Sequence, residues 1–344
     1  MNRRDFLKGM AGGAGAVAAG GASSAEARPN REPAPEAVAM LFDSTLCVGC
    51  KACVTKCKTV NGMPPETRAD ETLPLWDSAP GLSAKTLNVI QAYTDGTAEV
   101  KDRETDGFAF VKRNCMHCVD PGCVSVCPVS AMTKDANNGI VFYDADACIG
   151  CRYCVYACPY DVPQFDYASS YGAISKCQFC NQQGVERLDH GLLPGCVEAC
   201  PTGATLFGTR EEMLAEARRR LALTPGSEYQ YPRETLDAGL EVPSTVPAYY
   251  PKIYGEEQGG GTQVLHLSGV AFDKLGLPIL PERSFASRSE GLLHTIYKGM
   301  FAPVALFAGV AWFARRNLQR QAQEHAGDPA EADSPRDDAH DDRG

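Results

Sequence analysis

The chain has 344 residues, a formal net charge of −10 and a sequence isoelectric point near 5.2. This acidic balance argues against a nucleic-acid partner, because such binding usually requires a basic patch. The length allows about two domains, and all sixteen cysteines lie between Cys47 and Cys200.

The N-terminus predicts export by the twin-arginine route. Two adjacent arginines followed by Phe-Leu-Lys open the chain, and a weakly apolar Gly/Ala segment covers residues 9–22. Residues 25–27 fit the small-residue rule for signal cleavage, so we interpret residues 1–27 as a signal peptide and Arg28 as the first residue of the mature chain. An uncleaved anchor is the alternative, although the apolar segment is short and poor in large side chains.

Residues 28–39 read as a linker because prolines and acidic residues alternate there. The cysteines that follow form four groups of four. In the third group, Cys148, Cys151, Cys154 and Cys158 precede a proline with the spacing C-x2-C-x2-C-x3-C-P, which holds cubane iron–sulfur clusters in bacterial two-cluster ferredoxins. The first three thiolates of that motif bind one cluster and the fourth reaches a second, so four motifs predict two pairs and four [4Fe-4S] clusters. The other groups vary the spacing, and they are Cys47, Cys50, Cys53 and Cys57 (group one), Cys115, Cys118, Cys123 and Cys127 (group two), and Cys177, Cys180, Cys196 and Cys200 (group four).

The four groups also form an internal repeat. Residues 43–50 match residues 144–151, and residues 121–128 match residues 194–201. Groups one and two therefore make a unit that recurs as groups three and four. We expect an α+β fold in which residues 40–208 form a duplicated bacterial-ferredoxin-like cluster domain with loop-rich insertions.

Disulfides and structural zinc are the other interpretations of these cysteines. Disulfides are the default in an exported cysteine-rich chain, but these runs crowd thiols locally instead of joining distant loops. Zinc also uses C-x2-C pairs, but four closely spaced thiolates followed by proline are not its usual pattern. His117 and His190 lie near cysteines, yet every cluster already has four cysteines available, so we do not expect either to be a ligand.

Other local features lie between the groups. We expect short strands at residues 88–93, 108–111 and 139–143. The insertion at residues 181–195 is either a surface loop or a partner contact, and the sequence leaves both open. Several basic side chains near the motifs either offset the negative charge of the clusters or are simply solvated; they are Lys51, Lys56, Arg113, Arg152 and Lys176.

Residues 209–291 are expected to hold one helix and then an extended region. Thr209 and Glu212 form a capping box, and an apolar face follows at helical spacing. A strand is expected at residues 264–267, after a run of three glycines. The extended part either wraps a partner or is an irregular domain tail.

Residues 292–314 are predicted to form a transmembrane helix that holds the protein at the inner membrane. At about 1.5 Å per residue they are long enough for the roughly 30 Å hydrocarbon core. A buried amphipathic helix is the alternative. Arginines follow directly, so the positive-inside rule predicts a cytoplasmic end and a periplasmic cluster domain. Residues 315–344 then form an acidic, disordered cytoplasmic tail.

Together these features resemble the four-cluster ferredoxin-type electron-transfer subunits of periplasmic membrane-bound oxidoreductases, and most closely those that serve hydrogenases. The resemblance covers nearly the whole chain. It rests on the twin-arginine start, on residues 43–50, 115–121, 181–189 and 259–265, and on the C-terminal apolar segment.

The resemblance implies that each cluster takes its ligands from two motifs. Lys58 stands where the motif usually has a proline, but this alters no ligand. The implied ligand sets are Cys47, Cys50, Cys53 and Cys200; Cys57, Cys177, Cys180 and Cys196; Cys115, Cys118, Cys123 and Cys158; and Cys127, Cys148, Cys151 and Cys154.

The resemblance also implies a relay without catalytic residues of its own. Electrons would pass between the small and large subunits of a periplasmic nickel–iron hydrogenase and an integral membrane quinone-reactive subunit, which couples hydrogen oxidation to the quinone pool. The same module in a formate dehydrogenase or molybdopterin reductase is the main alternative, although formate dehydrogenase subunits usually travel on their partner's export signal. A non-redox scaffold stabilised by metal is the alternative from another class.

Overall fold

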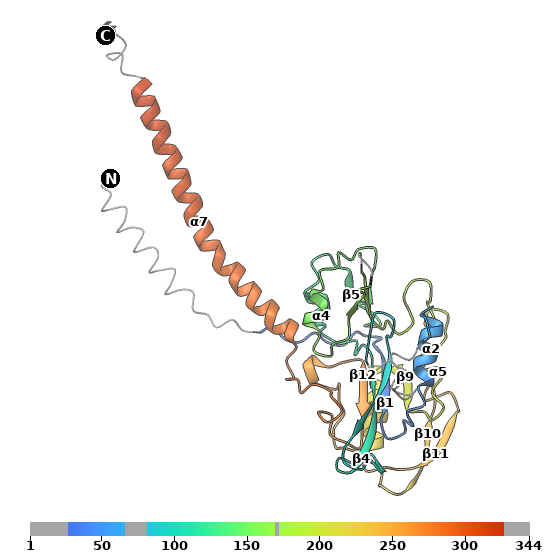
Figure 1. Cartoon of the computed structure of the whole chain (residues 1–344). Coiled ribbons are helices and arrows are strands. Elements are labelled where there is room, and N and C mark those ends of the chain that lie inside the picture. Colours follow the sequence, from blue (N-terminus) through green and yellow to red (C-terminus); the bar gives the residue numbers. More distant parts are fainter. Residues whose placement is uncertain (1–26, 66–80, 169–171, 327–344) are drawn as a thin grey trace, which may run out of the picture. The chain divides into compact units, whose positions relative to one another are not determined.

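The computed structural model describes residues 27–65, 81–168 and 172–326 (Figure 1). The predicted signal peptide, apart from Ala27, and the tail beyond residue 326 lie outside these residues. The chain divides into a larger unit, Ala27–Glu290, and a second unit that contains the C-terminal helix from Gly291 onward. Each unit is described by itself.

A three-stranded sheet is the framework of the larger unit (Figure 1). Strand β1 (Val38–Asp43) lies in the middle, parallel to β12 (Val264–Leu267) and antiparallel to β9 (Thr205–Thr209). Successive side chains of a strand point to opposite faces, so β1 contributes to two cores. Ala39 and Leu41 pack with helix α6 (Arg210–Leu221), whereas Met40 and Phe42 face the core that contains the cysteines.

Helix α6 confirms the prediction made from its capping box. The Thr209 side chain accepts a hydrogen bond from the Glu212 backbone N–H, and the Glu212 carboxylate accepts one from the Thr209 backbone. The fully buried Arg220 near the end of the helix donates to Asp43 Oδ2 and to Glu216 Oε1, both at 2.8 Å. This buried ion pair attaches α6 to the end of β1.

A second sheet has the order β2-β4-β3. Strand β2 (Val89–Thr94) pairs antiparallel with β4 (Gly107–Arg113), with Ile90 opposite Lys112, and β3 (Val100–Lys101) lies on the other side of β4. The strands predicted at 88–93, 108–111, 139–143 and 264–267 are thus confirmed, the third as β6. The remaining strands form two-stranded sheets: β5 (Met132–Lys134) with β6 (Val141–Tyr143), β7 (Gln164–Phe165) with β8 (Ile174–Ser175), and β10 (Glu228–Pro232) with β11 (Glu241–Thr245).

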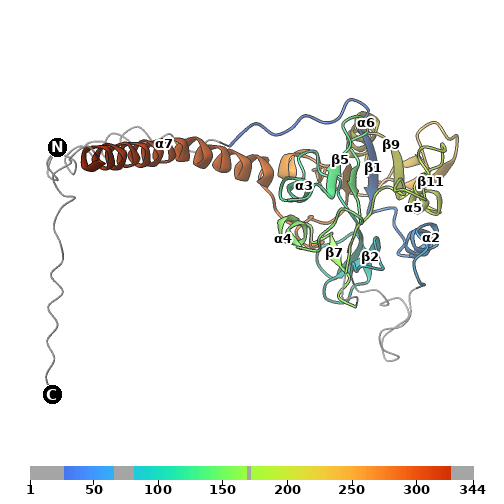
Figure 2. The same ribbon diagram turned by 90° about the horizontal axis from the view of Figure 1, so that it is seen from above.

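Four short helices carry or flank cysteines, and they occur as two pairs (Figure 2). The first pair is α2 (Ala52–Val60) with α5 (Gly195–Glu198). The second pair is α3 (Gly122–Ser125) with α4 (Tyr153–Ala157). A single 3₁₀ turn, η2 (Gln258–Gly260), precedes β12. The two helix pairs are the structural counterpart of the repeat seen in the sequence.

The prediction of an α+β fold with one C-terminal transmembrane helix is wrong. The architecture mixes small sheets with short helices, and the C-terminal segment forms one helix, α7 (Phe285–Ala326). Within the described ranges, no helix combines the length and the apolar character needed to cross a membrane. The prediction for residues 292–314 relied on length, whereas His294, Lys298, Pro303 and several glycines and alanines dilute the apolar side chains there.

Candidate iron–sulfur centres

Cys47, Cys50, Cys53 and Cys200 line one small cavity, and we call them set one. They come from the loop after β1, from α2 and from the residues just after α5. Gly49 adopts a left-handed φ of 69°, and a Cβ there would lie 2.5 Å from the Phe110 ring. Only glycine therefore allows this loop to pass close to β4.

Cys57, Cys177, Cys180 and Cys196 line a second cavity, and we call them set two. All four are buried. The Asn61 amide lies 3.6 Å from Cys57 Sγ and 3.9 Å from Cys180 Sγ, and the Phe179 N–H points at Cys177 Sγ. These donors favour a sulfur atom that carries negative charge.

The other eight cysteines form two further sets. Burial raises the pKa of Cys118, and Cys158, Cys123 and Cys115 raise it further, so we call these four set three. Burial raises the pKa of Cys154 to about 11, and Cys148, Cys127 and Cys151 also raise it, so we call these four set four. Each of the four sets thus draws on two sequence motifs, and the assignment of these sets as the ligands of four clusters stays a prediction.

The two repeats share the same local devices. Lys51 and Arg152, each just before a cysteine-bearing helix, both have left-handed φ angles, of 57° and 63°. Each partner helix begins with a glycine at the helix contact: a Cβ on Gly122 would lie 3.0 Å from the Ala157 carbonyl oxygen, and one on Gly195 would lie 2.9 Å from Val60 Cγ2. The duplication is therefore present in backbone geometry as well as in cysteine spacing.

Burial raises the pKa of several of the thiols. It raises the pKa of Cys47 to about 12 and those of Cys158 and Cys196 to about 11, and neighbouring cysteines add to the effect in each case. Binding to a soft metal centre favours the thiolate over the protonated thiol, because a coordinating thiol loses its proton. Close groups of four thiols in a largely apolar core fit iron–sulfur clusters in this respect. Across the described ranges, no three His, Cys, Asp or Glu side chains converge on the position of a single metal ion.

The sets follow one another in space. Cys53 of set one and Cys57 of set two lie one turn apart on α2. Cys123 of set three lies on α3, which packs against α4 with Cys154 of set four. Sets two and three are joined by ring stacking, described next, so the order along the molecule is one, two, three, four.

His117 and Phe179 make that joining contact. Their rings stack with centroids 3.9 Å apart and an interplanar angle of 20°. His117 lies between two cysteines of set three, and Phe179 between two of set two. Both side chains are fully buried, and His117 Nδ1 accepts a hydrogen bond from the Val141 N–H. This buried stack was not predicted, because it depends on residues 62 positions apart in the sequence. His190, by contrast, is exposed.

The predicted cations have different environments. Lys176 is buried and donates to the carbonyls of Val141 and Cys177. Arg152 lies over the rings of Phe165 and Tyr167, Lys56 pairs with Glu198 at 3.3 Å, and Arg113 donates to the Gly276 carbonyl.

Two lysines near the thiols were missed. Lys112 is buried in β4, and Lys134 donates to the Cys118 and Gly139 carbonyls.

The insertion at residues 181–195 is held to the cluster domain. The Asn181 side chain bonds Asp189 Oδ1 at 3.0 Å and accepts from the Leu188 N–H at 2.9 Å. Arg187 pairs with Glu198 on α5 at 2.7 Å. An ordered loop results, and its use as a partner contact stays a prediction.

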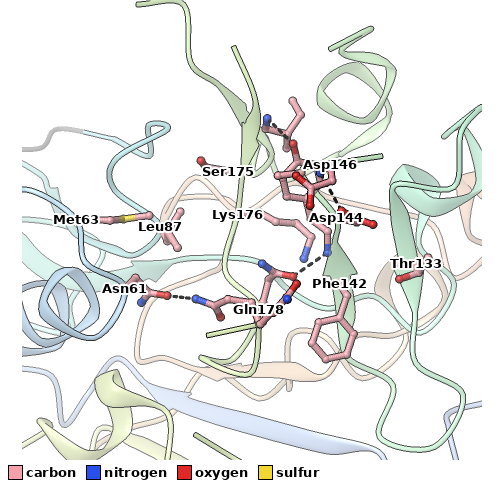
Figure 3. Close-up of a pocket in the computed structure, with 15 residues that line it drawn as sticks. Asn61, Met63, Leu87, Thr133, Phe142, Asp144, Asp146, Ser175, Lys176 and Gln178 are labelled. Carbon is pink, nitrogen blue, oxygen red and sulfur yellow. Dashed lines mark hydrogen bonds between the residues drawn. The ribbon is translucent and has the colours of Figure 1, made fainter. Parts of the chain in front are cut away.

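A larger cavity is lined by residues from both sequence repeats (Figure 3). Its wall includes Asn61, Phe142, Asp144 and Gln178. Gln178 Oε1 accepts from the Tyr143 N–H at 2.8 Å, and Gln182 donates to Asn61 Oδ1. The polar groups thus bond to one another across the cavity, and its lining contains no cysteine.

Comparison with known proteins agrees with this geometry. A family model described as a 4Fe-4S dicluster domain matches residues 107–210. A model of the twin-arginine translocation pathway signal sequence matches residues 1–20, which confirms that prediction and supports export to the periplasm.

Individual relatives cover almost the whole chain. The chain is 55% identical over 319 residues to the hydrogenase-2 operon protein HybA of Escherichia coli O157:H7, covering 93% of this chain and 96% of that protein, and HybA of Shigella flexneri matches equally. It is 34% identical over 292 residues to the formate dehydrogenase-O iron-sulfur subunit of Escherichia coli K12, covering 82% and 84% of the two chains. With iron–sulfur relatives at this level of identity, the chain belongs to the HybA family of ferredoxin-type iron–sulfur proteins.

Proposed function

We propose that this protein is the electron-transfer subunit of a periplasmic nickel–iron hydrogenase. Sets one to four each hold one [4Fe-4S] cluster, and electrons from hydrogen oxidation pass through the four clusters toward a membrane-embedded quinone-reactive subunit. Association with the membrane then comes from that partner.

The serial arrangement of the four thiol sets carries this proposal. Neighbouring sets are linked by α2, by the stack of His117 on Phe179, and by the packing of α3 on α4. The exposed cysteines are Cys50 in set one and Cys151 in set four, whereas sets two and three have buried or half-buried cysteines. Sets one and four are therefore the ends at which electrons enter and leave.

The chain's own residues hold and insulate the clusters. When bound, each cluster supplies a one-electron store whose potential depends on nearby charge, hydrogen bonds to sulfur and burial. Phe42 and Ile90 exclude water from set one, and Phe179 and Leu87 do so at set two. The Asn61 amide and the Phe179 N–H donate toward the sulfur atoms of set two.

The relatives favour a hydrogenase as the catalytic partner. Identity is 55% to the hydrogenase-2 operon protein and 34% to the formate dehydrogenase subunit. The chain's own twin-arginine signal points the same way. Formate dehydrogenase remains the second candidate, because its iron–sulfur subunit aligns over most of the chain.

Metal analysis and spectroscopy test the cofactor. Protein purified anaerobically is expected to contain about sixteen iron atoms and as many acid-labile sulfides per chain, from four cubanes. Reduction should produce low-temperature electron paramagnetic resonance signals. Zinc in place of iron, with no signal after reduction, would instead support a structural scaffold.

A deletion strain tests the partner. Membranes that lack this chain are expected to lose hydrogen-dependent quinone reduction and to keep formate-dependent reduction, with hydrogenase activity toward an artificial dye retained. Loss of the formate-dependent reaction alone would assign the protein to the second candidate.

A further inference from the structure

Lys112 is a buried cation whose role the relay has not yet explained. It lies in β4, and the residue is only 1% exposed. Its ammonium has no hydrogen-bond acceptor in the described part of the chain, and it lies near enough to the Cys196 thiol to lower the pKa of that thiol. A buried charge without an opposite charge is strongly unfavourable, so this site requires negative charge nearby.

The strand geometry places Lys112 between sets one and two. Phe110 and Lys112 are two positions apart in β4, so their side chains point to the same face of the strand, and Asn114 follows just after the strand ends. The Phe110 ring lies against Gly49, between Cys47 and Cys50 of set one, whereas Asn114 lines the cavity of set two. Lys112 is the middle residue of the three.

Strand β2, which pairs with β4, also has residues at both cavities. Ile90, paired with Lys112, lines the cavity of set one. Asn88, two residues earlier, lines the cavity of set two and donates to the Cys53 carbonyl at 3.0 Å. The face shared by β2 and β4 therefore spans both cavities, with Lys112 where they meet.

Thiols of both sets act on the Lys112 ammonium. Burial alone would lower its pKa, but Cys196, Cys53, Cys57 and Cys200 together raise it above the ordinary value. Cys53 and Cys200 belong to set one, and Cys57 and Cys196 belong to set two. The other buried lysines differ, because Lys58 donates to the Lys85 carbonyl and Lys176 donates to the carbonyls of Val141 and Cys177.

We propose that Lys112 is a positioning residue whose fixed positive charge is shared by the clusters of sets one and two and raises the reduction potential of both. The inference rests on the proposed function. One electron from the hydrogenase partner adds one negative charge to either cluster beside the ammonium. The shared cation thereby favours electrons on this half of the relay.

The test uses full-length protein purified anaerobically and loaded with clusters. Lys112→Met and Lys112→Gln remove the charge, Lys112→Arg keeps it, and Lys85→Met removes an exposed lysine as the control. Each variant is titrated with reductant while the paramagnetic signals of the individual clusters are followed, and iron is counted in parallel.

We expect the neutral variants to lower the equilibrium constant for reduction of two clusters at least tenfold, which is about 59 mV for a one-electron couple. The other two clusters should stay unchanged, and Lys112→Arg and Lys85→Met should behave like the wild type. Selective loss of two clusters in the neutral variants, restored by arginine, would equally support a shared charge.

Three results would overturn the inference: unchanged potentials in the neutral variants, a change confined to one cluster or spread evenly over four, or a Lys112→Arg variant as impaired as Lys112→Met. If none of the three Lys112 variants loads clusters, arginine has failed to replace lysine, and this result also overturns the inference. Wild-type protein without iron would instead refute the proposed function.

Discussion

At the scale of single residues, one substitution tests which cluster a thiol is proposed to hold. Cys158 directly follows α4, which carries Cys154 of set four, yet the thiol that raises its pKa is Cys115 of set three, in addition to burial. Cys158→Ser should therefore damage the cluster of set three and leave that of set four intact. Iron content and paramagnetic spectra should resemble those of Cys123→Ser and differ from those of Cys151→Ser. The opposite match would contradict the crosswise assignment.

His266 gives a pH dependence that involves no thiol. It is fully buried in β12, with its ring against Phe42 at 5.5 Å and Tyr254 at 6.3 Å. Burial lowers its pKa to about 3, and Arg113 and Lys112 add to this effect. Between the ordinary value of about 6.5 and this one, the unfolded chain binds a proton that the folded chain does not. Stability is therefore complete above about pH 6.5 and falls as the pH drops toward 3.

His266→Phe keeps a ring in place and removes this titration. Below pH 6.5 the wild type should lose stability more steeply than the variant, by up to about 1.4 kcal/mol per pH unit. Thermal midpoints of the loaded proteins between about pH 7.5 and 5 measure the difference. If the thermal midpoints of the wild type and the variant fall equally with pH, His266 does not change its protonation state on unfolding.

At the scale of elements, the two helix pairs provide a matched experiment. A Cβ on Gly122 would meet a backbone carbonyl, that of Ala157, at 3.0 Å, whereas a Cβ on Gly195 would meet the Val60 and Lys56 side chains, nearest at 2.9 Å. Side chains can move aside more easily than backbone. Gly122→Ala should therefore reduce cluster retention and thermal stability more than Gly195→Ala. Equal losses would indicate that both helix contacts are equally rigid.

Local signals explain which elements the sequence could predict. The capping box of α6, the alternating apolar strands and the cysteine motifs each depend on residues close together in the chain. Lys112 and the stack of His117 on Phe179 depend on how strands and loops meet, so no local pattern revealed them. The transmembrane prediction failed for another reason, since the length of residues 292–314 was taken as sufficient although their apolar character is too low.

At the scale of the larger unit, one ion-pair cluster connects distant parts of the chain. Arg28 donates to both Asp120 oxygens at 2.8 Å and to Glu290 at 2.6 Å, and Ser284 also donates to Asp120. These contacts join the expected mature N-terminus, the second cysteine motif and the start of α7.

Arg28→Ala should destabilise the larger unit because it leaves the buried Asp120 carboxylate with weaker compensation, from Arg31 at 3.6 Å. Breaking a buried pair costs about 3–5 kcal/mol, and the half-buried position of Arg28 makes the lower end the better expectation. Adding Asp120→Asn should recover part of the loss, as thermal midpoints of the single and double variants would show. Additive losses would contradict a direct coupling of the two residues.

The exposure of Cys50 and Cys151 has a consequence for handling in air. Oxidants reach the protein from solvent, so oxidative damage should begin at the clusters proposed for sets one and four, while those of sets two and three persist. A preparation would then keep much of its brown colour and iron after the clusters of sets one and four have stopped accepting electrons. The brown colour would then overestimate the fraction of protein in an aged sample that still transfers electrons.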